Sequence, residues 1–267
     1  MNLAVSNIAW PPELDASVYP MLVAHGIGAV EVAPTRHWPH WQGITAQAAS
    51  GVRRAAEDAG LRISSLQSIL FQKPELRLFG STPDREALYQ HVARCAHLAE
   101  QLGAECVIFG APKNRDRGSL SEADALAIAT EFFSRVGSYY AGCGVCLGFE
   151  PNPIQYGCNF ATDSVVAARL VRAVASPGFR LHLDSACLHL AGEDTAAVLD
   201  ETADVLCHFH VSEPYLGGFS TPEVAHRNIA ASLQAYHHWV ALEMRATESP
   251  LAALEEAVCF LRTTYGN

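Results

Sequence analysis

The sequence lacks the features that would mark a membrane, secreted or nucleic-acid-binding protein. It contains no run of about 18 apolar residues, the length that a membrane-spanning helix needs. Residues 1–6 read as a strand, without a basic stretch and a long apolar stretch, so we expect no signal peptide and a cytoplasmic location. Basic residues are few: 18 Lys and Arg stand against 28 Asp and Glu, a formal net charge of −10. This balance argues against nucleic acid as a partner, because proteins that bind it usually carry a basic face.

Low-complexity runs and linkers rich in Ser, Gly and Pro are also missing, so nothing divides the chain. Of 267 residues, 49% are hydrophobic and 17% charged, which predicts one domain with a large core. The eight cysteines are scattered rather than gathered in loops, as is typical of small buried side chains in a reducing compartment. Cys143 and Cys146 form a CxxC pair, but no second pair follows at zinc-ribbon spacing. We therefore favour a structural role for this pair over a redox or metal-binding one.

What the sequence does contain is a repeated unit of one strand and one helix, which occurs eight times. Eight such units, joined by right-handed crossovers, predict a single-domain α/β fold over residues 1–267, the (β/α)8 TIM barrel. An open doubly wound sheet would usually show a glycine-rich turn after its first strand, and residues 7–12 contain no glycine. The expected strands lie near 2–8, 29–33, 62–67, 105–109, 145–150, 179–184, 205–211 and 239–244. The expected helices lie near 14–25, 44–59, 82–102, 121–141, 162–175, 194–203, 222–237 and 250–265.

Four consecutive expected strands end in a side chain that can bind a metal, namely Glu150, Asp184, His210 and Glu243. Strand ends of a barrel meet at one rim, so we expect these side chains to converge. Three carboxylates and one imidazole suit one divalent ion, either Mn²⁺, Mg²⁺, Co²⁺ or Zn²⁺, and the carboxylate majority favours a hard ion. A single acid at a strand end is usually a helix cap or solvated, and a single core histidine usually bonds to the backbone. Four in succession are hard to obtain by chance and predict a metal site.

Four short motifs surround these residues: Phe149-Glu150-Pro151-Asn152, His182-Leu183-Asp184, His208-Phe209-His210-Val211-Ser212-Glu213 and Val240-Ala241-Leu242-Glu243-Met244. They resemble the xylose-isomerase-like barrel superfamily of sugar isomerases and epimerases, and are nearest to its ketose 3-epimerase branch. The resemblance covers nearly the whole chain. It implies that Glu150, Asp184, His210 and Glu243 bind the metal, and that Glu150 and Glu243 are catalytic because they pass a proton through an enediolate. It also suggests a homo-oligomer, either a dimer or a tetramer.

The chain departs from the ketose 3-epimerase branch at three positions where that branch contacts its sugar. Tyr156 stands where the branch has a glutamate, Cys187 where it has a histidine, and Leu216 where it has an arginine. The branch's own substrate is therefore not carried over to this chain.

Other residues are expected to contact the substrate or to support the metal ligands. Arg245 shares a strand face with Glu243, and Arg115 follows the fourth strand, where it could meet a phosphate or carboxylate. Trp10 and Trp38 could form an apolar wall. His182 and His208 lie one pleat below a ligand and are expected to hydrogen-bond around the metal site. Cys187 and Tyr156, at two of the positions that depart from the branch, are also expected to contact the substrate.

The leading hypothesis is a metal-dependent isomerase or epimerase of a sugar or sugar phosphate. A dehydratase or lyase that acts on a polyol or keto acid, as inosose dehydratases do, could use the same metal and acids. A barrel retained only for binding would have lost ligand residues, and all four are present. Phosphodiester hydrolysis would call for a rim richer in histidine and a basic surface, so we consider it less consistent with this sequence.

Overall fold

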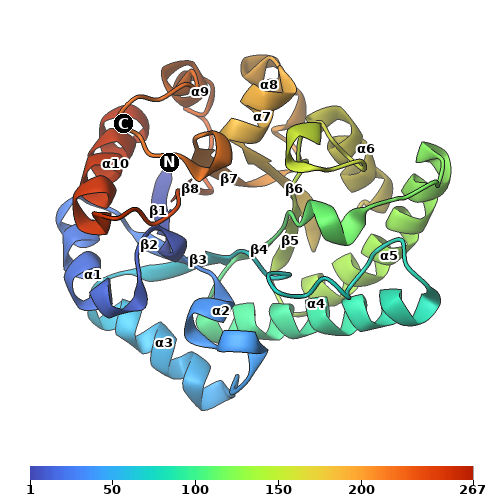
Figure 1. The fold of residues 1–267 in the computed structure, drawn as a ribbon, viewed down its shortest axis with the longest axis horizontal. Coiled ribbons are helices and arrows are strands. Elements are labelled where there is room, and N and C mark those ends of the chain that lie inside the picture. Colours follow the sequence, from blue (N-terminus) through green and yellow to red (C-terminus); the bar gives the residue numbers. More distant parts are fainter. Residues whose placement is uncertain (267) are drawn as a thin grey trace.

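The structure is a computed structural model that describes residues 1–266. Eight parallel strands close into a barrel in chain order, so the predicted (β/α)8 TIM barrel is confirmed. Figure 1 shows the helices arranged around the strands. The strands are β1 (Asn2–Ser6), β2 (Ala29–Val32), β3 (Arg62–Leu66), β4 (Cys106–Phe109), β5 (Cys146–Phe149), β6 (Phe179–Asp184), β7 (Leu206–Ser212) and β8 (Trp239–Glu243).

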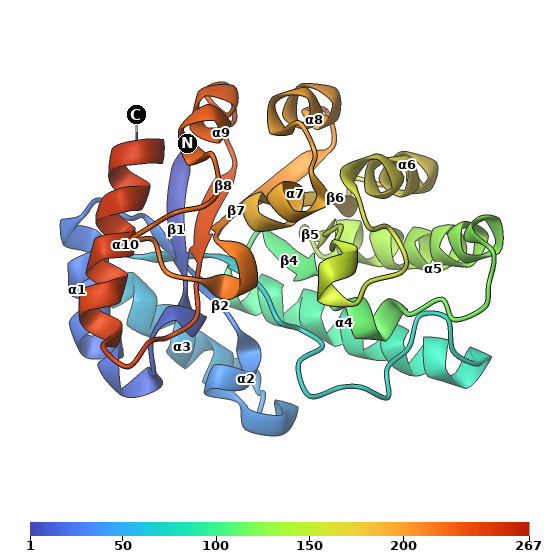
Figure 2. The same ribbon diagram turned by 45° about the horizontal axis from the view of Figure 1, so that its top comes forward.

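The helices form the outer layer, and in both ribbon views the last helix lies beside the first (Figures 1 and 2). Strands β1 and β8 pair directly, which closes the barrel where the two ends of the chain meet. The helices are α1 (Asp15–Ala24), α2 (Pro34–His37), α3 (Ala46–Asp58), α4 (Thr82–Leu102), α5 (Glu122–Gly142), α6 (Ser164–Val174), α7 (Ser185–Ala191), α8 (Thr195–Thr202), α9 (His226–Ser232) and α10 (Pro250–Tyr265).

The strands are buried on both faces, as expected of a parallel sheet that is covered all around. The register between neighbouring strands sets the level of each rim residue: Asp184 of β6 pairs with His210 of β7, and Ser212 of β7 pairs with Glu243 of β8. One irregularity interrupts the pairing of β6 and β7. Leu181 pairs with Leu206 and the next residue of β6 pairs with His208, so Cys207 is an extra residue in β7.

Three helices differ from the sequence-based prediction. The predicted helix over 222–237 is reduced to α9, and the short helices α2 and α7 were not predicted. Helix α4, which was predicted, begins at a reciprocal capping box formed by the Ser81 side chain and Asp84.

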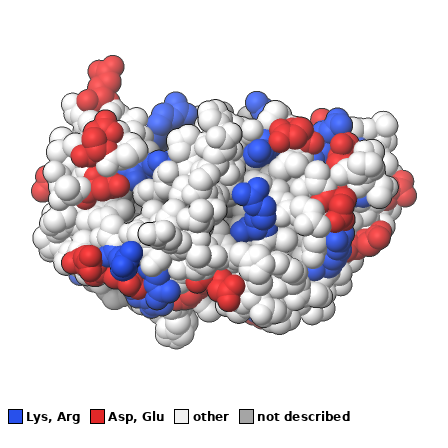
Figure 3. Space-filling model, turned by 90° about the horizontal axis from the view of Figure 1, so that it is seen from below, with Lys and Arg blue, Asp and Glu red and all other residues white. Residues whose placement is uncertain are grey.

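Charges of both signs are mixed on one face of the molecule. The face in Figure 3 shows Lys and Arg side chains interspersed with Asp and Glu, without one continuous basic area on that face of the described chain. Within residues 1–266, no helix is both long enough and apolar enough to span a membrane.

Candidate metal centre

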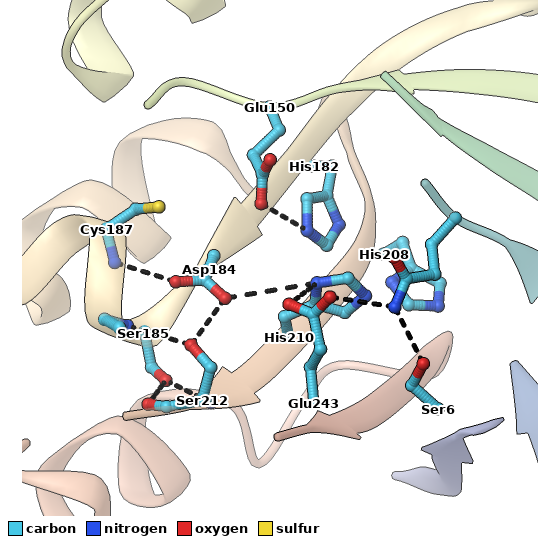
Figure 4. Close-up of polar contacts among 12 residues, drawn as sticks. Ser6, Glu150, His182, Asp184, Ser185, Cys187, His208, His210, Ser212 and Glu243 are labelled. Carbon is cyan, nitrogen blue, oxygen red and sulfur yellow. Dashed lines mark hydrogen bonds and ion pairs between the residues drawn. The ribbon is translucent and has the colours of Figure 1, made fainter. Parts of the chain in front are cut away.

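The ends of β5 to β8 bring the four predicted ligands to one rim of the barrel (Figure 4). Glu150, Asp184 and His210 each offer one ligand atom, and these atoms lie within 4.8 Å of one another. The His210 Nδ1 atom lies 3.3 Å from Glu243 Oε2 and 4.0 Å from Asp184 Oδ2. The four side chains therefore lie close enough together to share one ion.

His210 is oriented by a buried acid that the sequence reading missed. Its Nε2 atom lies 2.9 and 3.1 Å from the two carboxylate oxygens of Glu31, which is fully buried on β2. The opposite nitrogen, Nδ1, is buried and has no hydrogen-bond partner among the described residues. A buried imidazole nitrogen that faces carboxylates and has no partner fits a metal ion, and a carboxylate behind the other nitrogen is the usual support for such a ligand. The only sequence signal for Glu31 was an acid within an otherwise apolar strand.

His208, the other histidine of β7, belongs to the same hydrogen-bond network. The Ser65 hydroxyl donates a hydrogen bond of 2.7 Å to Glu31 and lies 3.0 Å from His208 Nε2. His208 is thus linked to the centre through Ser65 and Glu31 rather than directly to a ligand. His182 takes a different place, with its Nε2 atom 3.4 Å from Glu150 Oε1. Burial lowers the pKa of both imidazoles well below its usual value, so both are neutral near pH 7.

Each carboxylate at the rim is held by a hydrogen-bond donor. Asp184 accepts bonds from the Cys187 backbone N–H (2.7 Å) and the Ser212 hydroxyl (2.6 Å), and the first of these caps α7. Glu243 accepts a bond of 2.8 Å from the Gln67 amide, which also donates to Ser6. These donors fix the carboxylates without neutralising them.

Glu150 is held by a relay that begins at a buried arginine. Asn152 donates a 2.9 Å bond to Glu150, and the Arg115 guanidinium donates a 2.8 Å bond to the Asn152 oxygen. Arg115 is fully buried, stacks 4.8 Å from the centre of the Phe149 ring and does not line either cavity beside the centre. The structure therefore does not bring Arg115 to these cavities as predicted; it places the guanidinium where it positions Asn152. Space for Glu150 comes from Gly110, where a Cβ atom would lie 2.2 Å from Glu150 Oε2.

The protonation of the centre reflects its crowded negative charge. Burial, with the charges of Glu150 and Glu243, raises the pKa of Asp184 to about 7, although His210 opposes this shift. Burial alone would lower the pKa of His210, but the nearby carboxylates of Glu31 and Glu243 raise it well above its usual value. The metal-free centre thus retains protons near neutral pH that a cation would displace.

Two cavities flank the centre, and both are lined by Glu150 and Glu243. The first, of 350 Å³, lies between the loops after β3 and β4 and includes Lys113 and Phe71. The second, of 330 Å³, is lined by three residues that the sequence analysis proposed as substrate contacts, Tyr156, Cys187 and Arg245. Lys113 and Phe71 were not predicted, because their loops carry no motif.

The two predicted tryptophans do not line these cavities. Trp10 is buried and donates a hydrogen bond of 2.7 Å to Asp15, while the Arg36 guanidinium lies over its ring. Trp38 is also buried, in the segment that follows β2. Both rings belong to the core, so the structure does not bring them to the cavities as predicted.

Comparison with known proteins is consistent with this geometry. A family model described as xylose isomerase-like TIM barrel matches residues 21–264. No curated protein matches the chain. Among solved structures, a D-psicose 3-epimerase from Clostridium cellulolyticum H10 is similar with a TM-score of 0.84 at 13% identity, over 99% of each chain. A 3-keto-D-glucoside 4-epimerase from E. coli has a TM-score of 0.78 at 15% identity, over 98% of this chain and 99% of that one.

A third solved structure, the probable 3-DHS dehydratase of petrobactin synthesis from Bacillus anthracis, has a TM-score of 0.71 at 16% identity over 98% of each chain. At these identities the likeness to solved structures shows the fold alone. The family model, which spans most of the chain, goes further. On this match, the chain belongs to the xylose isomerase-like TIM barrel family.

Proposed function

We propose that the protein is a divalent-metal-dependent isomerase or epimerase of a sugar or sugar phosphate, which transfers a proton between Glu150 and Glu243. The observation that carries this proposal is the placement of these two carboxylates. Both line both cavities at the rim, Glu243 Oε2 lies 3.3 Å from His210 Nδ1, and Glu150 offers a ligand atom within 4.8 Å of those of Asp184 and His210. A single base can hardly reach both faces of a substrate carbon, so epimerisation calls for two.

The residues that would hold the metal are Glu150, Asp184, His210 and Glu243, and the ion would be Mn²⁺, Mg²⁺, Co²⁺ or Zn²⁺. When bound, such an ion polarises the substrate carbonyl and offsets the negative charge that develops on its oxygen. The fit rests on the donor set and on the buried Nδ1 atom of His210, which has no hydrogen-bond partner among residues 1–266.

The protein's own groups would carry the proton. One glutamate accepts the proton bound to carbon, and the other returns a proton on the opposite face. Asn152 holds Glu150 and Gln67 holds Glu243 by hydrogen bonds of 2.9 and 2.8 Å, so each carboxylate is fixed in orientation before substrate binds. Lys113 in the first cavity and Arg245 in the second are the cations available to an anionic group of the substrate.

A dehydratase is the second candidate, because a solved structure of similar fold is a probable 3-DHS dehydratase. The same pair of acids could remove a proton and assist the departure of water. The two candidates differ in the fate of the hydroxyl next to the carbonyl.

The test is turnover in D₂O. The metal-loaded protein, incubated with a panel of ketoses, sugar phosphates and 3-keto sugars, should introduce deuterium at a carbon-bound position, detected by NMR and mass spectrometry. Glu243→Gln should abolish exchange, whereas Glu248→Gln, a change of an exposed acid nearby, should leave it intact. Loss of water would support the dehydratase, and turnover without deuterium in any product carbon would refute proton transfer.

A further inference from the structure

Three cysteines lie together at the amino-terminal end of the barrel, opposite the rim. Cys106 is the first residue of β4, Cys146 is the first residue of β5, and Cys207 is the extra residue of β7. They are distant in sequence and come from three strands. Cys143, the other half of the CxxC pair, lies apart from them, beside His97 and Glu100.

The distances among the thiols suit a metal site. The three Sγ atoms lie within 4.8 Å of one another, and Cys106 Sγ lies 3.7 Å from Cys207 Sγ. In a tetrahedral zinc site with Zn–S bonds of about 2.3 Å, neighbouring sulfur atoms are about 3.8 Å apart. The observed pair thus has the spacing of two ligands of one ion, and is well beyond the bonding distance of a disulfide.

Two features of the backbone make room for this cluster. The irregularity in β7 inserts Cys207 beside the level of Cys106. On β5, a Cβ atom at Gly148 would lie 3.1 Å from Cys106 Sγ and 3.3 Å from Cys207 Sγ. Any larger residue at position 148 would crowd both thiols, so the glycine gives them their space.

A cavity of 550 Å³ leads to the cluster and is lined by all three cysteines. Its wall includes His208, which is fully buried and whose Nδ1 atom has no hydrogen-bond partner among residues 1–266. Cys146 is half-buried, and exposed residues such as His238 line the same cavity, so an ion could enter from solvent.

The electrostatics at the cavity favour a thiolate. The neighbouring Cys106 and Cys207 thiols, with the charges of Arg180 and His238, lower the pKa of Cys146 well below its usual value, whereas burial raises the pKa of Cys106. The thiolate is the form of cysteine that binds metals.

We propose that Cys106, Cys146 and Cys207 form a second metal site, which binds one thiophilic divalent cation of the Zn²⁺ class. The fourth ligand comes from the cavity, either water or the free nitrogen of His208. Binding displaces the thiol protons, involves no change of oxidation state and ties β4, β5 and β7 together. The end of the barrel away from the active site is the end that serves stability, so this ion is structural rather than catalytic.

Cadmium provides the direct test. The reduced, chelator-treated protein should develop an ultraviolet thiolate-to-metal absorption band on titration with Cd²⁺, and the band should saturate when one Cd²⁺ is bound at the cysteines, in addition to any Cd²⁺ held at the rim. Cys106→Ala and Cys207→Ala should each weaken this binding by about 100-fold or more. Cys259→Ala, at an exposed cysteine outside the cluster, and Asp184→Asn, at the rim, should retain the band. Absence of the band in the parent protein, or its persistence in both cluster variants, would overturn the proposal.

A second measurement needs no variant, in case the cluster variants do not fold. Iodoacetamide labelling of the parent protein, followed by peptide mass spectrometry, should show that Zn²⁺ slows modification of Cys146 on the order of tenfold or more. Cys259 serves as the internal reference and should react at the same rate with and without Zn²⁺. Equal Cys146 rates in both conditions would contradict the site.

Discussion

At the scale of single residues, Glu31 fixes the orientation of the His210 imidazole. Its carboxylate contacts His210 Nε2, and this leaves Nδ1 to face the other carboxylates. Burial alone would raise the pKa of Glu31, but the charge and hydrogen bond of His210 lower it below its usual value. The pair is therefore ionic in the absence of a metal. An ion at Nδ1 would take the place of the proton there.

Removing the charge of Glu31 should weaken the metal site without unfolding the barrel. Glu31→Gln keeps the size of the side chain but no longer supports a basic imidazole, so we expect Mn²⁺ affinity to fall about 10–100-fold. Isothermal titration calorimetry would measure the Mn²⁺ affinity. Glu57→Gln, on the exposed face of α3, is the control and should leave the affinity unchanged. Unchanged affinity in Glu31→Gln would show that the contact does not tune the ligand.

The raised pKa of Asp184 predicts a pH dependence of metal binding. Its value of about 7 means that the carboxyl group is protonated below that pH in the metal-free protein. Metal and proton compete for this oxygen, so Mn²⁺ affinity should decrease as pH falls below about 7, by up to about tenfold per pH unit. Binding near pH 6 should release protons, measurable by calorimetry in buffers of different ionisation enthalpy. Affinity that is constant between about pH 6 and pH 8 would contradict this account.

Gly110 shows how the backbone itself shapes the centre. A methyl group there would overlap Glu150 Oε2, so Gly110→Ala should displace a carboxylate that we propose is catalytic. We expect a large loss of kcat with a decrease of about 1–3 kcal/mol in the free energy of unfolding. Gly118→Ala, where a Cβ atom would meet nothing within 4 Å, is a control for surface loops, although its positive φ adds strain. Full activity in Gly110→Ala would show that Glu150 lies elsewhere in the working enzyme.

At the scale of elements, the sequence predicted all eight strands to within about two residues, because long apolar segments alternating with helical ones leave little choice of fold. The elements that were predicted wrongly or not at all are short helices. Helix α7 has only seven residues and begins at a cap, Asp184, whose side chain the sequence reading assigned to the metal alone. Helix α9 is short because a tertiary contact holds the segment before it. Glu213 accepts hydrogen bonds from the backbone N–H groups of Glu223 and Val224.

That contact makes Glu213 a stability determinant. Its carboxylate is buried and also lies 2.7 Å from His226 Nε2, so Glu213→Ala would leave several buried polar groups without a partner. We expect a decrease of about 2–4 kcal/mol in the free energy of unfolding, measured by urea denaturation. Glu223→Ala, an exposed acid in the same segment, should cost less than about 0.5 kcal/mol. A similar small change in both variants would contradict the anchoring role.

At the scale of the whole molecule, barrel closure explains which parts of the site could be predicted. The four proposed ligands on β5 to β8 could be placed at one rim from sequence because the ends of adjacent parallel strands meet there. Glu31 on β2 contacts His210 of β7 across the barrel. This contact could not be predicted, because no local sequence pattern indicates which residues of distant strands meet. The burial of Arg115, Trp10 and Trp38 could not be predicted either, because a loop residue can point inward or outward with the same local sequence.

The central claim is that the four rim side chains share one cation. A crystal structure of the Mn²⁺-loaded protein, with anomalous diffraction data at the manganese edge, tests it most directly. The account predicts one strong anomalous peak at the rim, about 2.0–2.3 Å from His210 Nδ1 and from oxygens of Glu150, Asp184 and Glu243. A fully loaded protein with no peak there, or with an ion held by other groups, would contradict it.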